Sequence, residues 1–249
     1  MQNPFDQQLE KPRKWRAAAL FFAGTLAIWG AYFVWRPPAP MLWTPRVEHM
    51  ENRRVVSLTI DDSPHPLSTP LLLAALEKCD VPVSFFSIGE GLRLYPELAH
   101  RIVKEGHALE NHSGPHHNLT TVDPRDFPLH IDAAFAQIEK TQRESGVSRG
   151  SRLFRPPGGG LNRAAMRYLY ENDITLAWWS NNVGDWQSPP AWKIARGVKA
   201  TLRAGDVVLL HDGGTGTPQA LFSIVEHARK NGLEFVVMPD IERAPKPQK

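Results

Sequence analysis

The chain has 249 residues, a length that suits one domain with an additional segment. Its 42% hydrophobic and 22% charged residues exclude a disordered chain, and its single cysteine, Cys79, excludes an intrachain disulfide. The formal net charge is +3, but residues 1–50 and 241–249 hold nine of the 29 basic and four of the 26 acidic residues, which leaves residues 51–240 with a net charge of −2. Because the folded part lacks a basic excess, we expect no nucleic-acid partner.

Residues 17–35 form an uncharged and mostly apolar segment. A helix of this length nearly spans the ~30 Å hydrocarbon core of a bilayer, and Trp15, Tyr32 and Trp35 lie where interfacial aromatic residues belong. A cleaved signal peptide and a buried core helix are the alternatives, but the apolar run is long for the first and lacks the polar face of the second. Four basic residues lie in the ten positions before the segment and one in the ten after it, which predicts a cytoplasmic amino terminus.

These features predict five successive parts of the chain. Residues 1–16 are a short cytoplasmic tail, 17–35 a single-pass transmembrane signal anchor in the cytoplasmic membrane, and 36–52 a proline-containing tether. Residues 53–240 are a folded domain that faces the periplasm or the cell exterior, and 241–249 are a basic tail. We expect contact with the membrane through the amino-terminal helix, and the sequence indicates no obligate protein partner.

Strand and helix patterns alternate from residue 55 onward. Short segments that are apolar and often β-branched or aromatic predict seven strands, at 55–60, 83–88, 107–111, 152–155, 175–179, 206–211 and 234–238. Six helices are predicted between them, at about 69–79, 95–105, 124–145, 162–172, 189–203 and 217–231. Repeated strand–helix units predict parallel strands with helices outside. Because the stretch is shorter than the ~250 residues of a complete barrel, we predict an α/β fold, a distorted, incomplete (β/α) barrel of about seven parallel strands, with a doubly wound open sheet as the alternative.

Polar side chains follow five of the seven predicted strands, at the carboxyl ends where such folds keep their chemistry. The first strand is followed by Asp61 and Asp62. Two carboxylates this close repel each other, and a bound cation would relieve the repulsion. One could bind a metal ion while the other acts as a base, although Asp-Asp-Ser-Pro is also typical of a solvated turn.

The third predicted strand is followed by His112 and His116. The residues Ser-Gly-Pro between them interrupt any helix, so a loop must fold back to bring the imidazoles together. Two imidazoles and the carboxylate of Asp62 make a three-ligand set with open positions, the pattern of a catalytic metal site. A polar, histidine-rich loop that includes His117 is the alternative. The spacing does not choose between Zn²⁺, Co²⁺ and Ni²⁺.

Three further strand ends carry Arg155, Asp185 and His211. An arginine can hold a carboxylate in one orientation, and Asp185 is suited to fixing the tautomer of His211 and supporting its protonated form. The glycines at 158–160 allow a close backbone approach to a substrate and offer amide donors. The alternatives are a surface charge for the arginine, a capped strand end for the histidine and a flexible loop for the glycines.

Taken in chain order, these segments resemble a known family. Thr-Ile-Asp-Asp, His-Ser-x-x-His, Arg-Pro-Pro-x-Gly, x-x-x-Asp-Trp and Leu-x-His are similar to the five motifs of the polysaccharide deacetylase family (NodB-homology domain, carbohydrate esterase family 4). The resemblance covers about residues 53–240. It implies a distorted (β/α) barrel and metal-dependent hydrolysis of N- or O-acyl groups on sugars, usually polymers of N-acetylglucosamine.

The resemblance implies a division of roles among the catalytic side chains. Asp61 would be the catalytic base and His211 the catalytic acid. Arg155 would orient Asp61, and Asp185 would support His211.

The resemblance also implies a metal site and a substrate site. Asp62, His112 and His116 would bind the divalent metal, which is usually Zn²⁺ in the family. Gly158 and Trp186 would serve the oxyanion and the substrate.

The sequence departs from the family pattern at four positions. Ile60 and Ser63 stand where the family usually has Phe and Gly, which leaves the chemistry unaffected. Gly158 stands where the family often has Tyr, so a substrate-packing ring is lost while the backbone amide stays. Asn182 stands where the fourth motif often begins with Asp, which removes a charge near the substrate. Because Asp185 is present, we expect activity.

The resemblance therefore predicts a metal-dependent hydrolase that removes N-acetyl groups from an N-acetylglucosamine-containing polysaccharide or oligosaccharide, peptidoglycan- or chitin-like, outside the cytoplasmic membrane. Deacylation of a lipid-linked sugar and O-deacetylation of another polysaccharide are alternatives within the same chemistry. A catalytically inactive glycan-binding protein and a membrane-anchoring factor, whose functional part is the apolar helix, are alternatives of other classes. The complete set of acidic, histidine and arginine side chains argues against an inactive protein.

Overall fold

The computed structural model describes residues 54–147 and 150–238. The strands of this part form one sheet and comprise β1 (Val55–Ser63), β2 (Ser84–Ser87), β3 (Ala108–Asn111), β4 (Leu153–Phe154), β5 (Thr175–Leu176), β6 (Asn181–Asn182), β7 (Val207–His211) and β8 (Glu234–Phe235). Seven of them follow the order β5-β4-β3-β2-β1-β7-β6, and β8 pairs with the amino-terminal end of β1. Every pairing is parallel, as the alternation of strands and helices predicts.

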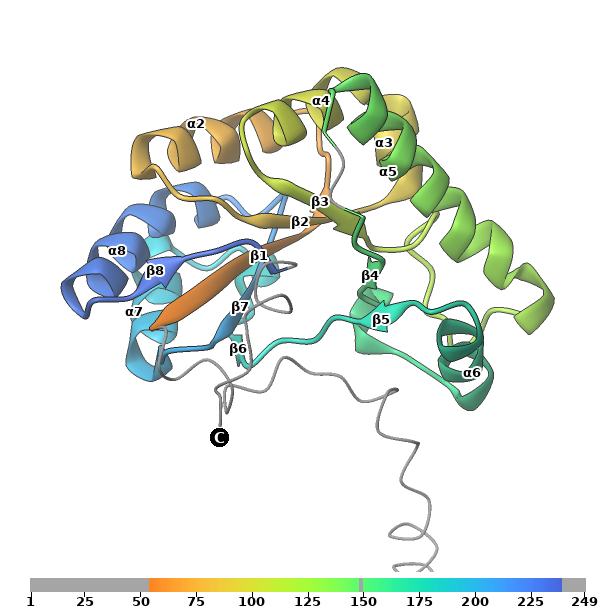
Figure 1. The fold of residues 1–249 in the computed structure, drawn as a ribbon. Helices are drawn as coiled ribbons and strands as arrows, with labels where there is room; N and C mark the ends of the chain where they lie inside the picture. The colour runs from red at the N-terminus through yellow and green to blue at the C-terminus, as the bar shows by residue number, and fades with distance from the viewer. Residues whose placement is uncertain (1–53, 148–149, 239–249) are drawn as a thin grey trace, which may run out of the picture. The chain divides into compact units, whose positions relative to one another are not determined.

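Helices lie outside the sheet. They are α2 (Thr69–Cys79), α3 (Gly89–Leu94), α4 (Pro96–Lys104), α5 (Ala133–Glu144), α6 (Arg163–Glu171), α7 (Ala191–Thr201) and α8 (Thr217–Lys230). Figure 1 shows the sheet curling, with α2 to α5 beside β2 and β3 and with α7 and α8 beside β7. This curled half-barrel agrees with the predicted distorted, incomplete (β/α) barrel rather than with a doubly wound sheet.

The half-barrel is open between β5 and β6, which form the two ends of the strand order. The N–H of Ala177 still donates to a carbonyl of β4, whereas the N–H of Ser180 already donates to a carbonyl of β7. The chain therefore crosses the opening within Trp178 and Trp179, whose rings stack with centroids 4.6 Å apart. Two large aromatic side chains thus lie where a closed barrel would have a further ladder.

The structure corrects the predicted elements in three places. The fifth predicted strand, 175–179, ends early and is followed by β6, which was missed because two asparagines are untypical of strands. The helix predicted at 95–105 is preceded by the separate helix α3. The helix predicted at 124–145 is divided into a 3₁₀ turn, a π-helical turn at Pro128–Asp132 and α5, because prolines lack the N–H that a continuous helix needs.

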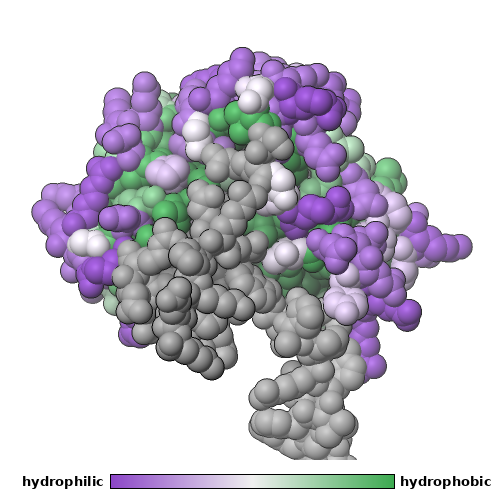
Figure 2. All heavy atoms as spheres, viewed as in Figure 1, coloured by the Kyte–Doolittle hydropathy of each residue, from purple (hydrophilic) through white to green (hydrophobic). Residues whose placement is uncertain are grey.

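The hydrophobic core forms around β1, the central strand. Its side chains Leu58 and Ile60 are fully buried and belong to a cluster that packs the sheet against the helices. Val56, at the start of the strand, is also fully buried and packs in a smaller cluster with Leu233. On the face drawn in Figure 2, hydrophilic residues cover much of the helical rim and hydrophobic residues show between them.

Within residues 54–147 and 150–238, no helix is both long enough and apolar enough to cross a membrane. The transmembrane segment predicted at 17–35 lies outside the described residues, as do the tail and tether that flank it and the basic tail at 241–249. These assignments stay predictions.

Replacing Leu58 by alanine should lower the free energy of unfolding by about 2–5 kcal/mol, because the change leaves a cavity beneath the central strand. Leu71→Ala on α2 is the matched control: Leu71 is 60% exposed, so its loss should change the free energy by less than about 0.5 kcal/mol. Urea denaturation followed by circular dichroism measures both. Equal destabilisation by the two variants would contradict the assigned core.

Candidate active site

The carboxyl end of β1 places two consecutive aspartates at the mouth of the half-barrel. β1 runs through Asp61 and Asp62 to Ser63, so both aspartates lie within the strand. Against β2, Asp61 pairs with Phe86 and Ser63 pairs with the next residue, which leaves Asp62 as the extra residue of a β-bulge, with a φ of 70°. Strand side chains normally alternate between faces. The bulge breaks this alternation, so both carboxylates line the same cleft.

Asp61 forms a buried ion pair with Arg155. The Nη1 atom of Arg155 lies 2.6 Å from Oδ1 of Asp61 and donates also to Oγ1 of Thr59 at 2.8 Å. The arginine side chain is fully buried, and its guanidinium carbon lies 3.9 Å from the centre of the Phe86 ring. Burial lowers the pKa of Arg155, and the Asp61 carboxylate opposes this effect. The predicted orienting residue therefore contacts the predicted base.

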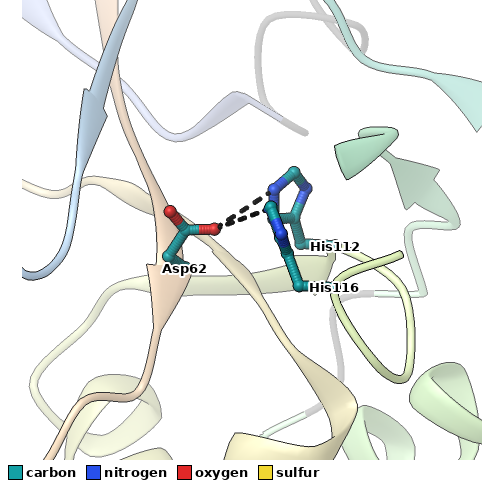
Figure 3. Close-up of side chains that lie close together, drawn as sticks. All are labelled: Asp62, His112 and His116. Carbon is teal, nitrogen blue, oxygen red and sulfur yellow. Dashed lines mark ion pairs between the residues drawn. The ribbon is translucent and has the colours of Figure 1, made fainter. Parts of the chain in front are cut away.

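Asp62, His112 and His116 converge on one point. Oδ1 of Asp62 lies 3.4 Å from Nε2 of His112 and 3.2 Å from Nε2 of His116. Figure 3 shows the carboxylate of β1 facing both imidazoles of the loop that follows β3. One ligand atom from each residue lies within 4.8 Å of the others. The three predicted metal ligands, which are up to 54 positions apart in the chain, are thus brought together.

Three observations indicate that this cluster fits a divalent metal ion. Nδ1 of His112 lies 2.8 Å from the carbonyl oxygen of Arg155, so Nδ1 carries the hydrogen and the lone pair of Nε2 faces the cluster, as is typical of histidine ligands. Oδ1 of Asp62 is buried and makes no hydrogen bond within the described part of the chain, which a cation would correct. His116 is exposed, so the site has an entry path.

Contacts within the cluster shift the pKa values of Asp62 and His116. Burial alone raises the pKa of Asp62, but the adjoining imidazoles of His112 and His116 outweigh burial and hold this pKa well below its ordinary value. The carboxylate is therefore ionised at neutral pH, as a metal ligand must be. The contact with Asp62 raises the pKa of His116. Protons and a metal ion thus compete for His116, which weakens metal binding in acid.

The loop that carries His116 is held by the π-helical turn that precedes α5. The hydroxyl of Ser113 donates to the carbonyl of His130 at 3.2 Å. Asn111 accepts the N–H of Ser113 at 2.8 Å and donates to a carbonyl of the same turn at 2.9 Å. These contacts fold the loop back toward β1, as the predicted metal site requires. His117 instead lies against His130, with ring centroids 5.4 Å apart, and is outside the cluster.

His211 and Asp185 form a second pair on the opposite side of Asp61. His211 is the register partner of Asp61 across the β1–β7 ladder. Oδ1 of Asp185 lies 2.8 Å from Nδ1 of His211, while its Oδ2 accepts the His211 N–H and the Thr217 hydroxyl, both at 2.8 Å. Burial lowers the pKa of His211, but the paired Asp185 carboxylate outweighs burial and raises it. His211 therefore keeps its proton to a higher pH than an ordinary histidine.

These groups meet at one cleft of about 340 Å³, a volume in the usual range of small-molecule sites. Gly158 and Trp186, the predicted oxyanion and substrate residues, both line it. Gly158 has a φ of 61°, a conformation that favours glycine, and Trp186 is 60% exposed. Asn182 also lines the cleft.

Some residues of the site had no predicted role. Thr59 accepts a hydrogen bond from the arginine that holds Asp61. Its place two residues before Asp61 on one strand was a usable signal, since such residues share a face. Thr217 donates to Asp185 across 32 positions of sequence, and only the fold brings these two together. Trp179 lines the cleft because the half-barrel is open beside it.

The arrangement combines the groups that hydrolysis of an acyl bond needs. Oδ1 of Asp61 is held by Arg155, while its Oδ2 faces the metal cluster, 3.7 Å from Nε2 of His112. A histidine with a raised pKa lies on the other side of the same carboxylate. A candidate base, a candidate acid and a candidate metal site thus share one cleft.

The sequence profile of the family described as polysaccharide deacetylase matches residues 49–177, which is more than half of the chain. The match includes the aspartate pair, both metal-site histidines and Arg155. The chain therefore belongs to the polysaccharide deacetylase family, as its motifs predict, and it is an enzyme of that family.

Individual relatives extend the similarity across the rest of the domain. A peptidoglycan-N-acetylglucosamine deacetylase of Bacillus cereus is 33% identical over 199 residues, which cover 77% of this chain and 90% of the relative. A chitooligosaccharide deacetylase of Bradyrhizobium sp. is 34% identical over 202 residues, which cover 76% and 90%. The crystal structure of the Bc1960 peptidoglycan N-acetylglucosamine deacetylase matches with a TM-score of 0.72 at 26% identity and covers 80% of this chain and 92% of that one.

Replacing Asp185 by asparagine should lower the pKa of His211, because burial would then act without the compensating carboxylate. Titration of the metal-free protein, followed by the imidazole resonances in NMR spectra, measures the change. The other histidines, which do not contact Asp185, serve as internal controls. An unchanged or higher pKa for His211 would contradict the assigned pair.

Proposed function

We propose that this enzyme removes N-acetyl groups from an N-acetylglucosamine-containing glycan, peptidoglycan- or chitin-like, with a divalent metal ion as cofactor. The observation that carries the proposal is the convergence of the Asp61–Arg155 pair, the Asp185–His211 pair and the Asp62 cluster on one cleft. The relatives named above act on glycans of this kind according to their names.

Asp61 acts as the general base. Arg155 donates a hydrogen bond to Oδ1 and holds the carboxylate in one orientation. Oδ2 faces the cleft and accepts the proton of the attacking water molecule. Because a base must lie within hydrogen-bond reach of the proton that it removes, the buried ion pair serves catalysis by fixing this oxygen.

Asp62, His112 and His116 would hold the metal ion. Two imidazoles and one carboxylate are a ligand set of catalytic zinc sites, so we propose Zn²⁺, with Co²⁺ and Ni²⁺ as metals of the same ligand preference. When bound, the ion would supply Lewis acidity, polarising the acyl carbonyl and making nearby water more acidic.

His211 acts as the general acid. An amide anion is a poor leaving group, so the departing sugar nitrogen must receive a proton as the carbon–nitrogen bond breaks. The raised pKa favours the protonated form of His211, and Asp185 holds the ring so that Nε2 carries the proton to be donated. Gly158 would offer its backbone N–H to the developing oxyanion, and Trp186 would contact the sugar.

Asp61→Asn should lower kcat by about 10²–10⁴-fold while leaving zinc affinity nearly unchanged, because asparagine still accepts a hydrogen bond from Arg155 but cannot take a proton. His112→Ala should instead lose zinc affinity. Isothermal titration calorimetry and acetate release measure the two properties separately. His117→Ala is the matched control for the histidine change, since His117 lies outside the cluster, and a fully active Asp61→Asn enzyme would sink the assignment.

An acetate-release screen with and without a chelator tests which glycan is the substrate. Peptidoglycan, chitooligosaccharides, acetylated xylan and lipid-linked sugars are the substrates to compare. Release from the first two, lost with chelator and restored by zinc, supports the proposal. Release from xylan alone would indicate O-deacetylation, and release from lipid-linked sugars alone would indicate a membrane-surface deacylase. No release from any of them would favour a glycan-binding protein.

We further propose that the domain at 53–240 works outside the cytoplasmic membrane, held by an anchor at 17–35 and a tether at 36–52. The support comes from the apolar segment and from the basic residues that precede it. The tails at 1–16 and 241–249 then have no part in catalysis.

A chain that begins at residue 37 should leave the membrane fraction but keep its acetate-release activity. The reason is that all residues of the cleft lie between Asp61 and His211. Fractionation of cells that express the full and shortened chains, followed by the activity assay on each fraction, measures both properties. Loss of activity from a shortened chain that still folds would mean that the amino-terminal segment contributes to the function.

A further inference from the structure

A second hollow lies beside the active site, between β6 and one face of α7. It has a volume of about 690 Å³ and is lined on the helix side by Trp192, Lys193, Arg196 and Ala200. Asn182, at the end of β6, lines both this groove and the catalytic cleft. The two hollows therefore share one lining residue and lie next to each other.

The groove has the chemistry of a site for an anionic sugar chain. Trp192 is 66% exposed and offers a flat apolar ring to the carbon–hydrogen face of a sugar at a low entropic cost. The only charged side chains of the lining are Lys193 and Arg196, both exposed. Neither forms an ion pair or a side-chain hydrogen bond with any residue of the described ranges. On the other wall, Asn182 accepts the N–H of Gly184 through its Oδ1, which leaves its NH₂ group as a donor.

The charge of the groove is opposite in sign to the small net charge of the domain. Residues 51–240 have a net charge of −2, and the catalytic cleft is lined by two aspartates. A groove whose charged groups are all cationic, placed next to an acidic cleft, favours a substrate that carries its negative charge away from the acetamide that reacts.

We propose that the α7 groove, formed by Asn182, Trp192, Lys193 and Arg196, binds a carboxylate-bearing part of the glycan whose N-acetyl group lies in the catalytic cleft. The inference rests on the proposed function and narrows it: the preferred substrate is an acidic glycan, with carboxylates on neighbouring sugars or on their substituents, rather than a neutral chitin-like one. Trp192 stacks on a sugar ring, and the two cations pair with the carboxylates.

The test compares two substrates and two double variants. The substrates are soluble peptidoglycan fragments, which carry carboxylates, and chitopentaose, which is neutral. Lys193→Glu with Arg196→Glu should lower kcat/KM for the acidic fragments by about tenfold and for chitopentaose by less than about twofold. Lys104→Glu with Lys140→Glu changes the net charge equally at exposed positions of α4 and α5 and should affect neither substrate. Trp192→Ala should raise KM for both substrates without changing kcat.

Other results overturn the inference. An equal loss of kcat/KM on the acidic and the neutral substrate, or no loss on either, would show that the groove does not bind carboxylates. Raising the salt concentration should reduce the preference for the acidic substrate, because exposed charges are screened, and a salt-independent preference would also contradict it.

A membrane surface is the competing occupant, since tryptophan and basic residues also bind anionic lipids. Sedimentation with phosphatidylglycerol vesicles and with insoluble peptidoglycan separates the two. If the charge reversal abolishes vesicle binding and leaves peptidoglycan binding and kinetics intact, the groove is a lipid site and the inference fails. If the unaltered enzyme releases no acetate from either substrate, the proposed function fails. Sedimentation of the unaltered and charge-reversed proteins with peptidoglycan then tests by itself whether the groove binds an acidic glycan.

Discussion

The buried ion pair between Arg155 and Asp61 is the contact on which the site depends. It joins the end of β4 to the end of β1. The second guanidinium nitrogen of Arg155 donates at 3.1 Å to the carbonyl of Trp178, which lies in the opening between β5 and β6. The backbone carbonyl of the same arginine accepts from His112. One buried residue therefore contacts Asp61, His112 and Trp178 and fixes their positions relative to one another. Removing either partner of such a pair costs about 3–5 kcal/mol, because a buried charge is left alone.

Two irregularities of the backbone turn this scaffold into a site. The bulge at Asp62 sends two neighbouring carboxylates into one cleft, where a regular strand would send them to opposite faces. The opening between β5 and β6 leaves space for Trp179 beside the cleft and frees β6 to end next to the α7 groove. These two departures from regularity therefore bring both carboxylates and Trp179 to the cleft.

The distribution of charge differs between the cleft and the α7 groove. The catalytic cleft holds aspartates that suit a cation and a base, whereas Lys193 and Arg196 make the adjacent groove cationic. The domain as a whole carries a small net negative charge. A substrate that satisfies both hollows presents a neutral acetamide to the first and a carboxylate to the second, which is the physical basis for expecting selection among glycans.

The sequence by itself predicted the parallel half-barrel, the family and the residues that the structure brings together in the Asp61–Arg155 pair, the Asp185–His211 pair and the Asp62 cluster. It could do so because apolar strands of regular spacing, five of which are followed by Asp, His or Arg, carry this information locally. Only the tertiary structure decided that Asp62 lies in a bulge, that β6 exists, that Thr217 completes the contacts of Asp185 and that Trp192 lines a groove that shares Asn182 with the cleft. These features depend on contacts between residues far apart in the chain, and no local pattern of side chains encodes such contacts.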